Sequence, residues 1–595
     1  MNNHKRNQSL TAAINKKFQH DLSHQHLTTM DFFRLQPLTC IEAVAGDKMS
    51  INVRSLVESA PLATKVYGSF HLDLHAFFVP FRLLWNNWNN YYYSNTSGEA
   101  GSYYIPCVDF SVKSNTDIFT ADDDQSRQRR KIFGSLGYPT TQLSKEYTSI
   151  EDLNQKRLIS AMPARAYQLI WWDWYRDSVH IPEVNKNSYI HTGSGQIATK
   201  DILSLFAPRY RSFRKDYITT ILSQASASLP GTTAEVETSP LGISINQETY
   251  YNSYPLRVGE GSLSGTSVFT QGSVNGNGIS GTAILQSLRT PVMRGAIALQ
   301  RWLERLGVTG TRPLERIVSN FGIRPEPSRL QMSELIGTKS ITLNVDGLLN
   351  TGSQGLMSQE DAPLDGNAFG SSSESFFGTQ TGRSVSSGQT DTWNYTCDEH
   401  GYIMVIGSIM PNYINDGYLD PLFTRGLSAK SEGSVDFFAP EFDGSGYTPV
   451  TLGQIATPYR WGATTEWQNA DIDQVVGYVP RYEDYRYIMD KISGDFNEEQ
   501  SQAYMRNMAL VRSLPSRLAP SAVVAGLNLT TPTVNDAALF DNHFQVTDKT
   551  LDHFVVNNFI VVDAEREISS AVLPTELSNL ANKDLVEVAR GGIRL

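Results

Sequence analysis

Two clusters of histidine and aspartate are suited by residue type and spacing to bind a metal ion. They are His20, His24 and His26 in one cluster and His71, Asp73 and His75 in the other. The first cluster falls in a segment of loop character, where three histidines arise readily by chance. The second occupies alternate positions of a strand-like segment, so its side chains would share one face about 6–7 Å apart. Because a polar strand face most simply contacts solvent or another subunit, we predict no metal site at either cluster.

The segment 208–217, named here the basic segment, interleaves cations with aromatic rings. Its cations are Arg209, Arg211, Arg214 and Lys215, and its rings are Tyr210, Phe213 and Tyr217. Cations that bind phosphates beside rings that stack on bases are what single-stranded nucleic acid requires. The alternative is a strand or loop edge whose arginines form ion pairs within the chain or between subunits. Both interpretations stay open, and the four cations are candidate DNA contacts.

The start of the chain is basic, whereas the chain as a whole is acidic. Lys5, Arg6, Lys16 and Lys17 all precede the first acidic residue, Asp21, and the complete chain has a formal charge of −11. A basic, polar arm of this kind could bind a polyanion and release its counterions. A frayed, solvated terminus is the alternative. We include these four cations among the candidate DNA contacts.

Sequence motifs of the common enzyme sites are absent. There is no Gly-Lys-Ser/Thr phosphate loop, no G-x-S-x-G elbow, no H-E-x-x-H and no G-x-G-x-x-G that opens a helix. Cys40, Cys107 and Cys397 show no metal-type spacing, and so few cysteines indicate maturation in a reducing cytosol. We find no apolar signal segment, and the most apolar stretch, 402–410, is too short to span a bilayer. We therefore predict no enzyme activity, no catalytic residue, no cofactor and no metal.

The composition favours a turn-rich β protein over a helical bundle. The 595 residues exceed the roughly 250–300 of a single core, and 44 glycines and 26 prolines interrupt the chain often. Strand signals gather toward both ends. In 67–79, alternation predicts Phe70, Leu72, Leu74 and Ala76 on a core face, opposite the second histidine cluster. The predicted strands are 38–44, 49–57, 67–79, 402–410, 434–438, 482–488 and 552–562.

The centre of the chain is predicted to carry helices and long insertions. The segment 166–178 has large apolar side chains at helical spacing, so we expect a buried face opposite an exposed pair of Asp173 and Arg176. A second helix is expected over 292–306. Segments rich in Gly and Ser predict a long inserted excursion over 226–286 and an extended loop over 350–390. The buried residues expected in the first helix are Tyr167, Ile170, Trp171 and Trp174.

Eight short blocks of sequence follow one another along the chain. They are FQHDLSHQHLTTM (18–30), VAGDKMSINV (44–53), HAFFVPFRLLWNNW (75–88), MPARAYQLIWWDWYRD (162–177), the helix and loop block 298–337, DEHGYIMVIGSIMP (398–411), FFAPEF (437–442) and VPRYEDYRYIMDKISGDF (479–496). In combination they resemble the major capsid proteins of microviruses, small tailless phages with single-stranded DNA, and especially the gokushovirus-like branch. Ala439 and the tail after Asn557 depart from the family pattern, so surface details are not transferred there.

The resemblance implies a mainly β fold, an eight-stranded viral jelly-roll β-barrel with long loop insertions that contain several α-helices. It implies a basic arm in 1–30, core strands in 31–84 and 401–565, insertions in 85–400, a surface protrusion in 226–286 and a tail in 566–595. A barrel core needs far fewer residues than the chain has. The surplus would form contacts between subunits.

The resemblance also implies a function. A major capsid protein would self-assemble into a T=1 icosahedral shell that encloses circular single-stranded DNA, with the 226–286 loop facing the host. Its partners would be further copies of itself, the DNA genome, a small basic DNA-binding protein, minor virion proteins and a host cell-surface receptor. It would assemble in the bacterial host cytoplasm and reside in the virion.

Two other classes of protein stay open. The Gly-, Ser- and Thr-rich loops are also typical of a receptor-binding spike or fibre protein. A large β-rich, aromatic chain resembles in composition a virion-borne polysaccharide-active enzyme. Such an enzyme would need two carboxyl groups about 5–9.5 Å apart in a cleft.

Overall fold

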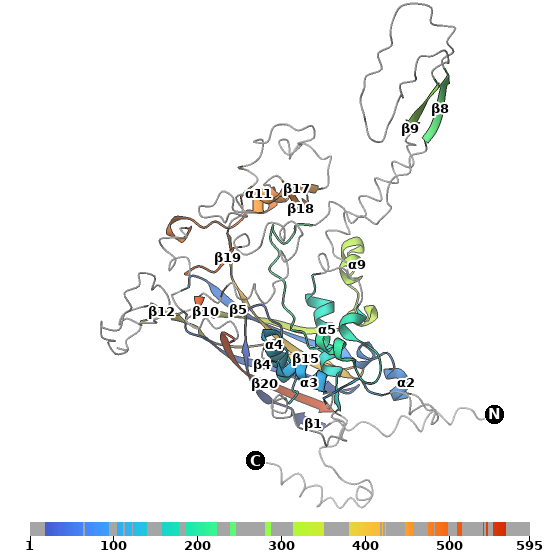
Figure 1. Ribbon diagram of the computed structural model, residues 1–595. Coiled ribbons are helices and arrows are strands. Elements are labelled where there is room, and N and C mark those ends of the chain that lie inside the picture. Colours follow the sequence, from blue (N-terminus) through green and yellow to red (C-terminus); the bar gives the residue numbers. More distant parts are fainter. Residues whose placement is uncertain are drawn as a thin grey trace, which may run out of the picture.

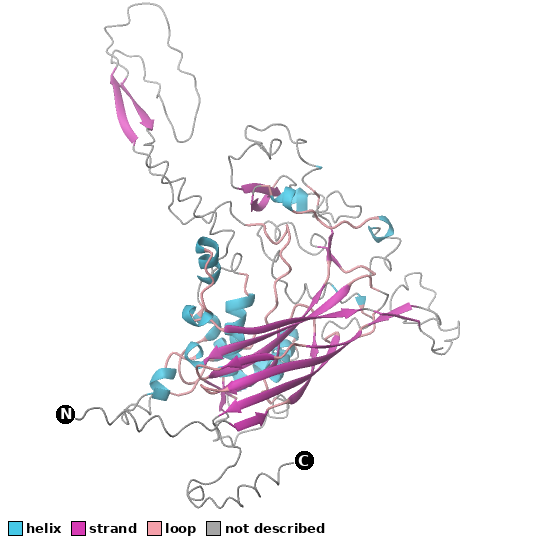
Figure 2. Cartoon of the chain, turned by 180° about the vertical axis from the view of Figure 1, so that it is seen from behind, coloured by secondary structure: helices cyan, strands magenta, loops and turns pink. Residues whose placement is uncertain are grey.

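The structure is a computed structural model of the chain, shown from two sides in Figures 1 and 2. The described residues are 18–62, 66–93, 104–110, 113–121, 123–139, 158–177, 186–222, 238–244, 280–286, 313–344, 346–349, 380–416, 419–420, 423, 447–455, 474–480, 482–497, 508–513, 540, 543–544 and 551–566. They are mainly β, with antiparallel pairing in both large sheets.

The first sheet runs in the order β1/β2–β20–β4–β13/β14. β1 and β2 lie one after the other along β20, and β13 and β14 lie one after the other along β4. The sheet therefore has four ranks, of which the two outer ones are each broken once. Its strands are β1 (Phe18–Asp21), β2 (His24–Met30), β4 (Lys48–Ser59), β13 (Val385–Gln389), β14 (Trp393–Thr396) and β20 (Phe554–Arg566).

The second sheet runs in the order β10–β5–β15–β3. Its central strands pair without a bulge from Gly401 opposite Pro80 to Pro411 opposite Phe70. Pro80 ends β5, as the sequence predicts, because proline has no N–H to donate to a neighbouring strand. The strands are β3 (Gln36–Ala43), β5 (Ser69–Pro80), β10 (Glu334–Asn344) and β15 (Gly401–Pro411).

The two sheets share one hydrophobic core. In β5, Phe70, Leu72, Leu74 and Ala76 are buried and alternate with half-buried polar residues, so the predicted alternation is confirmed. β20 contributes its alternate residues from the opposite sheet. Burial of each large apolar side chain stabilises the fold by about 1.5–3 kcal/mol. The members from β20 are Phe554, Val556, Ile560, Val562 and Ala564.

Two glycines allow the sheets to approach closely at one edge. A Cβ atom on Gly388 of β13 would lie 2.5 Å from Cγ2 of Ile341 in β10. A Cβ atom on Gly337 of β10 would lie 2.4 Å from Cδ1 of Trp393 in β14. Real Cβ atoms do not approach other atoms so closely, so side chains at these positions would force the sheets apart.

Among the described residues, helices cover the outer face of the second sheet and none covers that of the first. Phe77 of β5 and Met404 of β15 share a second core with α5 and α4 (Figure 1). The helices of this region are α1 (Phe81–Leu84), α2 (Trp88–Tyr93), α3 (Lys113–Thr120), α4 (Asp124–Ser135), α5 (Met162–Ile170), the π-helix η3 (Trp171–Tyr175), α6 (Asn187–Ile190) and α7 (Thr199–Leu205).

The remaining elements are short. The two-stranded pairs are β6 (Cys107–Asp109) with β7 (Leu158–Ser160), β8 (Thr238–Ser244) with β9 (Ser280–Gln286), β11 (Asp346–Leu349) with β12 (Gln380–Arg383), β16 (Ile414–Asp416) with β19 (Val511–Ser513), and β17 (Tyr447–Thr451) with β18 (Val475–Pro480). The helices are α9 (Pro313–Phe321), η5 (Pro327–Leu330), α11 (Leu452–Ile455), α13 (Glu483–Arg486) and η7 (Gly494–Asn497).

Most predicted strands are present, and two predictions were wrong. The strands expected in 38–44, 49–57, 67–79, 402–410 and 552–562 are confirmed as β3, β4, β5, β15 and β20. The strand expected over 482–488 is instead the helical turn α13, which Tyr482 opens in the left-handed region at φ 67°. The expected loop 350–390 contains β12 and β13. The strand 434–438 and the helix 292–306 lie outside the described residues.

The large sheets use more of the chain than the segments 31–84 and 401–565. β1 and β2 come from the expected arm, and β10, β13 and β14 come from the expected insertions. In the sequences of these five strands, the alternation of apolar and polar residues is weaker, because polar residues and glycines interrupt it. Of the expected protrusion 226–286, the described residues are those of β8 and β9.

The helix expected over 166–178 is confirmed in part. Tyr167, Ile170 and Trp171 are buried, as predicted. The exposed Asp173–Arg176 pair was wrong, since both side chains are buried. The reason is a π-turn, in which the N–H of Arg176 donates to the carbonyl of Trp171 and the wider turn rotates the following residues.

Candidate functional site

The basic segment lies against the chain that links β2 to β3. The N–H of Leu35 donates to the carbonyl of Arg209, and the N–H of Arg211 donates to the carbonyl of Phe33, at 2.8 and 2.7 Å. Backbone pairing thus fixes the segment beside the second sheet. Alternate side chains of the segment consequently point toward the protein.

Arg209 is held by contacts within the chain. Its Nε donates to Oε1 of Gln168 at 2.6 Å, and its guanidinium lies 4.3 Å from the centre of the Trp171 ring. Burial lowers the pKa of Arg209 from its usual value. A guanidinium stacked on a buried indole is a packing contact, so this side chain is committed inside the subunit.

Arg211 contacts the polar face of β5 that the second histidine cluster forms. It makes an ion pair with Asp73, while Nδ1 of His75 contacts the hydroxyl of Tyr175. Burial, and secondly the charge of Arg211, lower the pKa of His75 to about 4. The face predicted to meet solvent or another subunit therefore packs against the basic segment. On this face, His75 is neutral near pH 7.

Arg214 and Lys215 are the exposed cations of the segment. Nη1 of Arg214 donates to Oδ1 of Asn412 at 3.0 Å. The rings of Phe213 and Tyr217 are buried, and Phe213 lies 3.7 Å from the guanidinium carbon of Arg512. Rings in this position are not available to stack on bases. The segment thus offers two cations without the neighbouring aromatic platform that its sequence indicates.

The first histidine cluster lies on β1 and β2. Nδ1 of His24 contacts the carbonyl of Leu22 at 2.9 Å, and Nδ1 of His26 contacts the carbonyl of Leu38 at 2.7 Å. Within the described part of the chain, no three His, Cys, Asp or Glu side chains gather as metal ligands would. The candidates Lys5, Arg6, Lys16 and Lys17 lie outside the described residues.

A buried charge network joins three residues that lie far apart in the sequence. Nη2 of Arg34 lies 2.6 Å from Oδ2 of Asp552, and Nζ of Lys131 in α4 lies 2.7 Å from Oδ1 of the same carboxylate. Burial alone would raise the pKa of Asp552, but Arg34 and Lys131 hold it below its usual range. Sequence reasoning missed this network, and the available signal was Arg34 within the apolar residues of 32–35.

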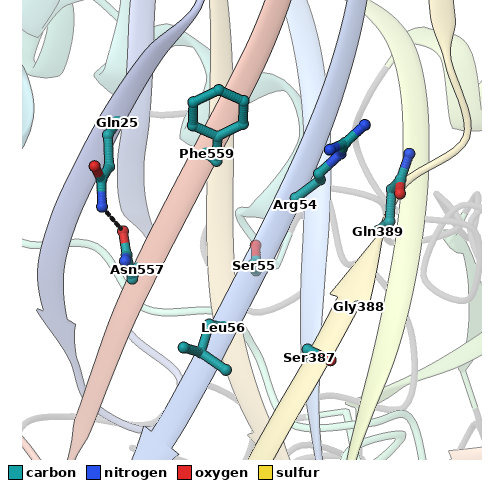
Figure 3. A pocket seen from close by; sticks show the side chains of 9 residues that line it. All are labelled: Gln25, Arg54, Ser55, Leu56, Ser387, Gly388, Gln389, Asn557 and Phe559. Atoms are coloured by element: carbon teal, nitrogen blue, oxygen red, sulfur yellow. Dashed lines mark hydrogen bonds between the residues drawn. The ribbon is translucent and has the colours of Figure 1, made fainter.

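The outer face of the first sheet exposes apolar side chains from four ranks. Leu27 is 68% exposed, Leu56 48%, Phe559 45% and Val385 54%. A shallow groove of about 490 Å³ crosses this face between β2 and β13. We call it the sheet groove (Figure 3), and its lining residues are Gln25, Arg54, Ser55, Leu56, Ser387, Gly388, Gln389, Asn557 and Phe559. Exposed apolar area of this kind marks an interaction surface.

The described helices include none that is both long and apolar enough to cross a membrane.

Comparison with known proteins gives one consistent result. Residues 9–573 match the family model described as capsid protein (F protein). The chain is 25% identical over 498 residues to capsid protein VP1 of Bdellovibrio phage phiMH2K, with 80% of this chain and 82% of that protein covered. It is 21% identical over 551 residues to capsid protein VP1 of Chlamydia phage 1, with 82% and 85% covered. It is 20% identical over 509 residues to capsid protein VP1 of Spiroplasma virus 4, with 81% and 82% covered.

Proposed function

Because the chain belongs to the phage capsid protein (F protein) family, it is a major capsid protein, and we propose that its copies close into a T=1 icosahedral shell around circular single-stranded DNA. The predicted resemblance to microvirus capsid proteins is confirmed. A structural role of this kind needs contacts between identical subunits. It does not need covalent chemistry.

The fold that would build this shell is an eight-stranded jelly roll. The order of the strands supports this: with β1/β2 and β13/β14 each counted as one rank, each of the two sheets has four. Along the chain, the ranks enter the first sheet, then the second, first, second, second, first, second and first. In each sheet the rank that comes last in the sequence lies between the two that come first: β20 lies between β1/β2 and β4, and β15 lies between β3 and β5. This nesting is expected of two Greek keys.

Large apolar side chains on the described surface support assembly into a multimer. Ile488 is 79% exposed, Phe321 72%, Ile323 62% and Tyr104 68%. Such side chains favour burial against other copies, and obligate interfaces commonly exceed about 2,000 Å². The elements that carry them lie outside the two large sheets. Tyr104, Phe321 and Ile323 fall within the expected insertions 85–400, whereas Ile488 falls within 401–565, so both parts of the chain would form contacts between subunits.

The proposed shell would have further partners. The cations Lys5, Arg6, Lys16 and Lys17, with the exposed Arg214 and Lys215, would neutralise DNA phosphates. A small basic DNA-binding protein would supply more positive charge, since the chain itself carries −11. The segment 226–286 would face outward and contact a host cell-surface receptor, alongside minor virion proteins. Assembly would take place in the bacterial cytoplasm.

Electron microscopy of the purified protein tests the proposal. We expect closed, uniform particles with icosahedral symmetry. A T=1 shell has one copy of the chain in each asymmetric unit, so each particle should contain about sixty copies. Nuclease-resistant single-stranded DNA should co-sediment with these particles. Open rings, trimers or monomers at high protein concentration would contradict the shell, and particles without nucleic acid would contradict the enclosure of DNA.

A further inference from the structure

We propose that the sheet groove binds single-stranded DNA, with Phe559 stacked on a base and Arg54 paired with a phosphate. This inference rests on the proposed enclosure of DNA and assigns that contact to named residues. It places the contact on the first sheet, away from the basic segment. Four observations carry it.

The first observation is a row of side chains across four strands. Gln25 of β2 pairs in register with Phe559 of β20, Phe559 with Arg54 of β4, and Arg54 with Gln389 of β13. All four residues are exposed and project from the outer face (Figure 3). Because neighbouring strands lie about 4.8 Å apart, the row spans about 14 Å. A ring, a cation and two amides are thus held at fixed spacing on a rigid sheet.

The second observation is the charge of the groove. Arg54 is the one charged residue among the nine that line it. Within the described residues Arg54 has no carboxylate partner, in contrast with Arg34 and Arg211, whose ion pairs lie elsewhere in the protein. The carboxylate of Glu58 lies on the same face of β4, beyond Leu56, and already has an interaction partner. The groove therefore offers an available cation to a phosphate.

The third observation is the set of side-chain amides. Nε2 of Gln25 donates to Oδ1 of Asn557 at 2.8 Å, as Figure 3 shows. This bond orients both amides and leaves Oε1 of Gln25 and Nδ2 of Asn557 for a ligand. With Gln389, they provide donors and acceptors beside an exposed ring. Unstacked bases are bound by this combination of ring stacking and hydrogen bonds to base edges.

The fourth observation is that the basic arm directly precedes the first strand of the same sheet in the sequence. Lys16 and Lys17 directly precede Phe18, the first residue of β1, and β1 pairs with β20, the strand that carries Phe559. The sheet that carries the groove therefore begins directly after these two lysines in the sequence. DNA that contacts the arm would be brought toward the same surface.

A second copy of the chain is the competing occupant of the groove. In a two-fold contact centred on it, Arg54 of one copy would approach Arg54 of the other, and like charges disfavour such a contact. The three amides would also have to find partners in a dry interface, where unpaired polar groups are costly. Single-stranded DNA satisfies both the cation and the amides.

Three single substitutions test the proposal in the full chain. Phe559→Leu removes the ring and keeps an apolar side chain, and Arg54→Gln removes the charge. Lys48→Gln is the matched control, because Lys48 is an exposed cation of the same strand and the same face but lies outside the groove. The probe is an oligothymidylate of about 20 nucleotides, longer than a typical site, titrated against unassembled protein. Ultraviolet cross-linking maps the peptide contacts of DNA inside purified particles.

We expect Phe559→Leu to weaken probe binding about tenfold. Arg54→Gln should reduce the slope of log affinity against log salt by about 0.7, the value for one phosphate of a single strand. Lys48→Gln should leave affinity nearly unchanged, and cross-links should fall on 554–566 and 48–59. Unaltered binding by both groove variants, or cross-links confined to other peptides, would overturn the proposal.

The outcomes separate this inference from the proposed function. If the groove variants bind the probe normally but no longer form particles, the groove is a subunit contact and the inference fails. If the variants form closed, DNA-filled particles with the cross-links of the unaltered protein, the inference fails while the shell stands. If even the unaltered protein forms no particles, the shell fails, and probe binding still decides the groove.

Discussion

Arg34 and Asp552 form a buried ion pair across 518 positions of sequence, with 2.6 Å between Nη2 and Oδ2. Each side chain is 1% exposed. Arg34 also donates to Gln128 of α4 and to the carbonyl of Thr29, so one guanidinium connects three parts of the chain. The pair fixes the start of β20 beside the turn between β2 and β3.

Asp552→Asn should lower the free energy of unfolding by about 3–5 kcal/mol, because it leaves the Arg34 guanidinium buried without its counter-charge. Urea denaturation of unassembled protein measures the loss. Glu399→Gln is the matched control: Arg82 and Glu399 are also 2.6 Å apart, but their side chains are 26% and 43% exposed. That change should cost less than about 1 kcal/mol. Equal losses in the two variants would show that burial does not determine the strength of the pair.

The same pair makes stability fall in acid. Since the pKa of Asp552 is below its usual range in the folded state, the stabilisation is present above about pH 4, the unfolded value. It is lost as the pH falls through the folded value. Asp552→Asn should remove this part of the acid dependence.

His75 should produce a separate pH dependence at milder acidity. Its pKa is about 4 in the folded protein against 6.5 for an ordinary histidine, because it is buried and lies near Arg211. Between these values the unfolded chain binds more protons, so stability rises with pH and is complete above about pH 6.5. His75→Gln should flatten the dependence of the urea midpoint on pH from 4 to 6.5. A slope that persists unchanged in the variant would assign the proton uptake to another group.

Tyr167 bridges α5 and the basic segment. Its hydroxyl donates to the carbonyl of Leu35 at 2.9 Å and accepts from the N–H of Arg209 at 3.0 Å. Tyr167→Phe leaves both backbone groups buried without this partner, so we expect a loss of about 1–3 kcal/mol in urea denaturation. Tyr91→Phe, at a ring that is 45% exposed, is the control and should be nearly neutral. A neutral Tyr167→Phe would mean that water replaces the hydroxyl.

Gly337→Ala should disturb the edge where the two sheets meet. The added Cβ would lie 2.4 Å from the Trp393 ring, so the ring or the sheet must move, at a cost of about 1–3 kcal/mol. Gly193→Ala is the control, since nothing lies within 4 Å of the corresponding Cβ. Thermal unfolding of unassembled protein compares the two. If both melt at the wild-type temperature, the sheets are free to separate at this edge.

The sequence predicts individual strands better than their partners. Phe70, Leu72 and Leu74 identify the core face of β5 because a strand alternates its side chains, which is a local property. In the first sheet β4 lies between β20 and β13. This arrangement is not a local property, since any two of the three strands are more than 160 residues apart in the sequence. The resemblance to a known family implied a mainly β fold, but it gave no partner for any individual strand.

The candidate contacts were harder to predict than the strands. Arg209 and Arg211 have the residue type that binds phosphate, yet Trp171 and Asp73 occupy them within the fold. Conversely, Phe559 and Arg54 are unremarkable in sequence and become neighbours only when β20 pairs with β4. Composition identifies side chains capable of a contact. Tertiary pairing decides which of them are available.

Removal of residues 1–17 tests the basic arm. The deletion ends before Phe18, so it spares β1 and its pairing with β20. Particles should therefore assemble with unchanged size but contain less DNA, because Lys5, Arg6, Lys16 and Lys17 no longer neutralise phosphates. The ratio of nucleic-acid absorbance to protein absorbance measures the DNA content of purified particles.

Two full-length variants separate charge from length in this arm. Replacement of the four cations by glutamine should reproduce the loss of DNA, because it removes the charge of the arm and keeps its length. Exchange of each lysine for arginine and of Arg6 for lysine keeps the charge and should restore normal content, since non-specific phosphate binding depends chiefly on charge. Normal DNA content in the glutamine variant would show that the genome is held by other surfaces, of which the sheet groove is the first to examine.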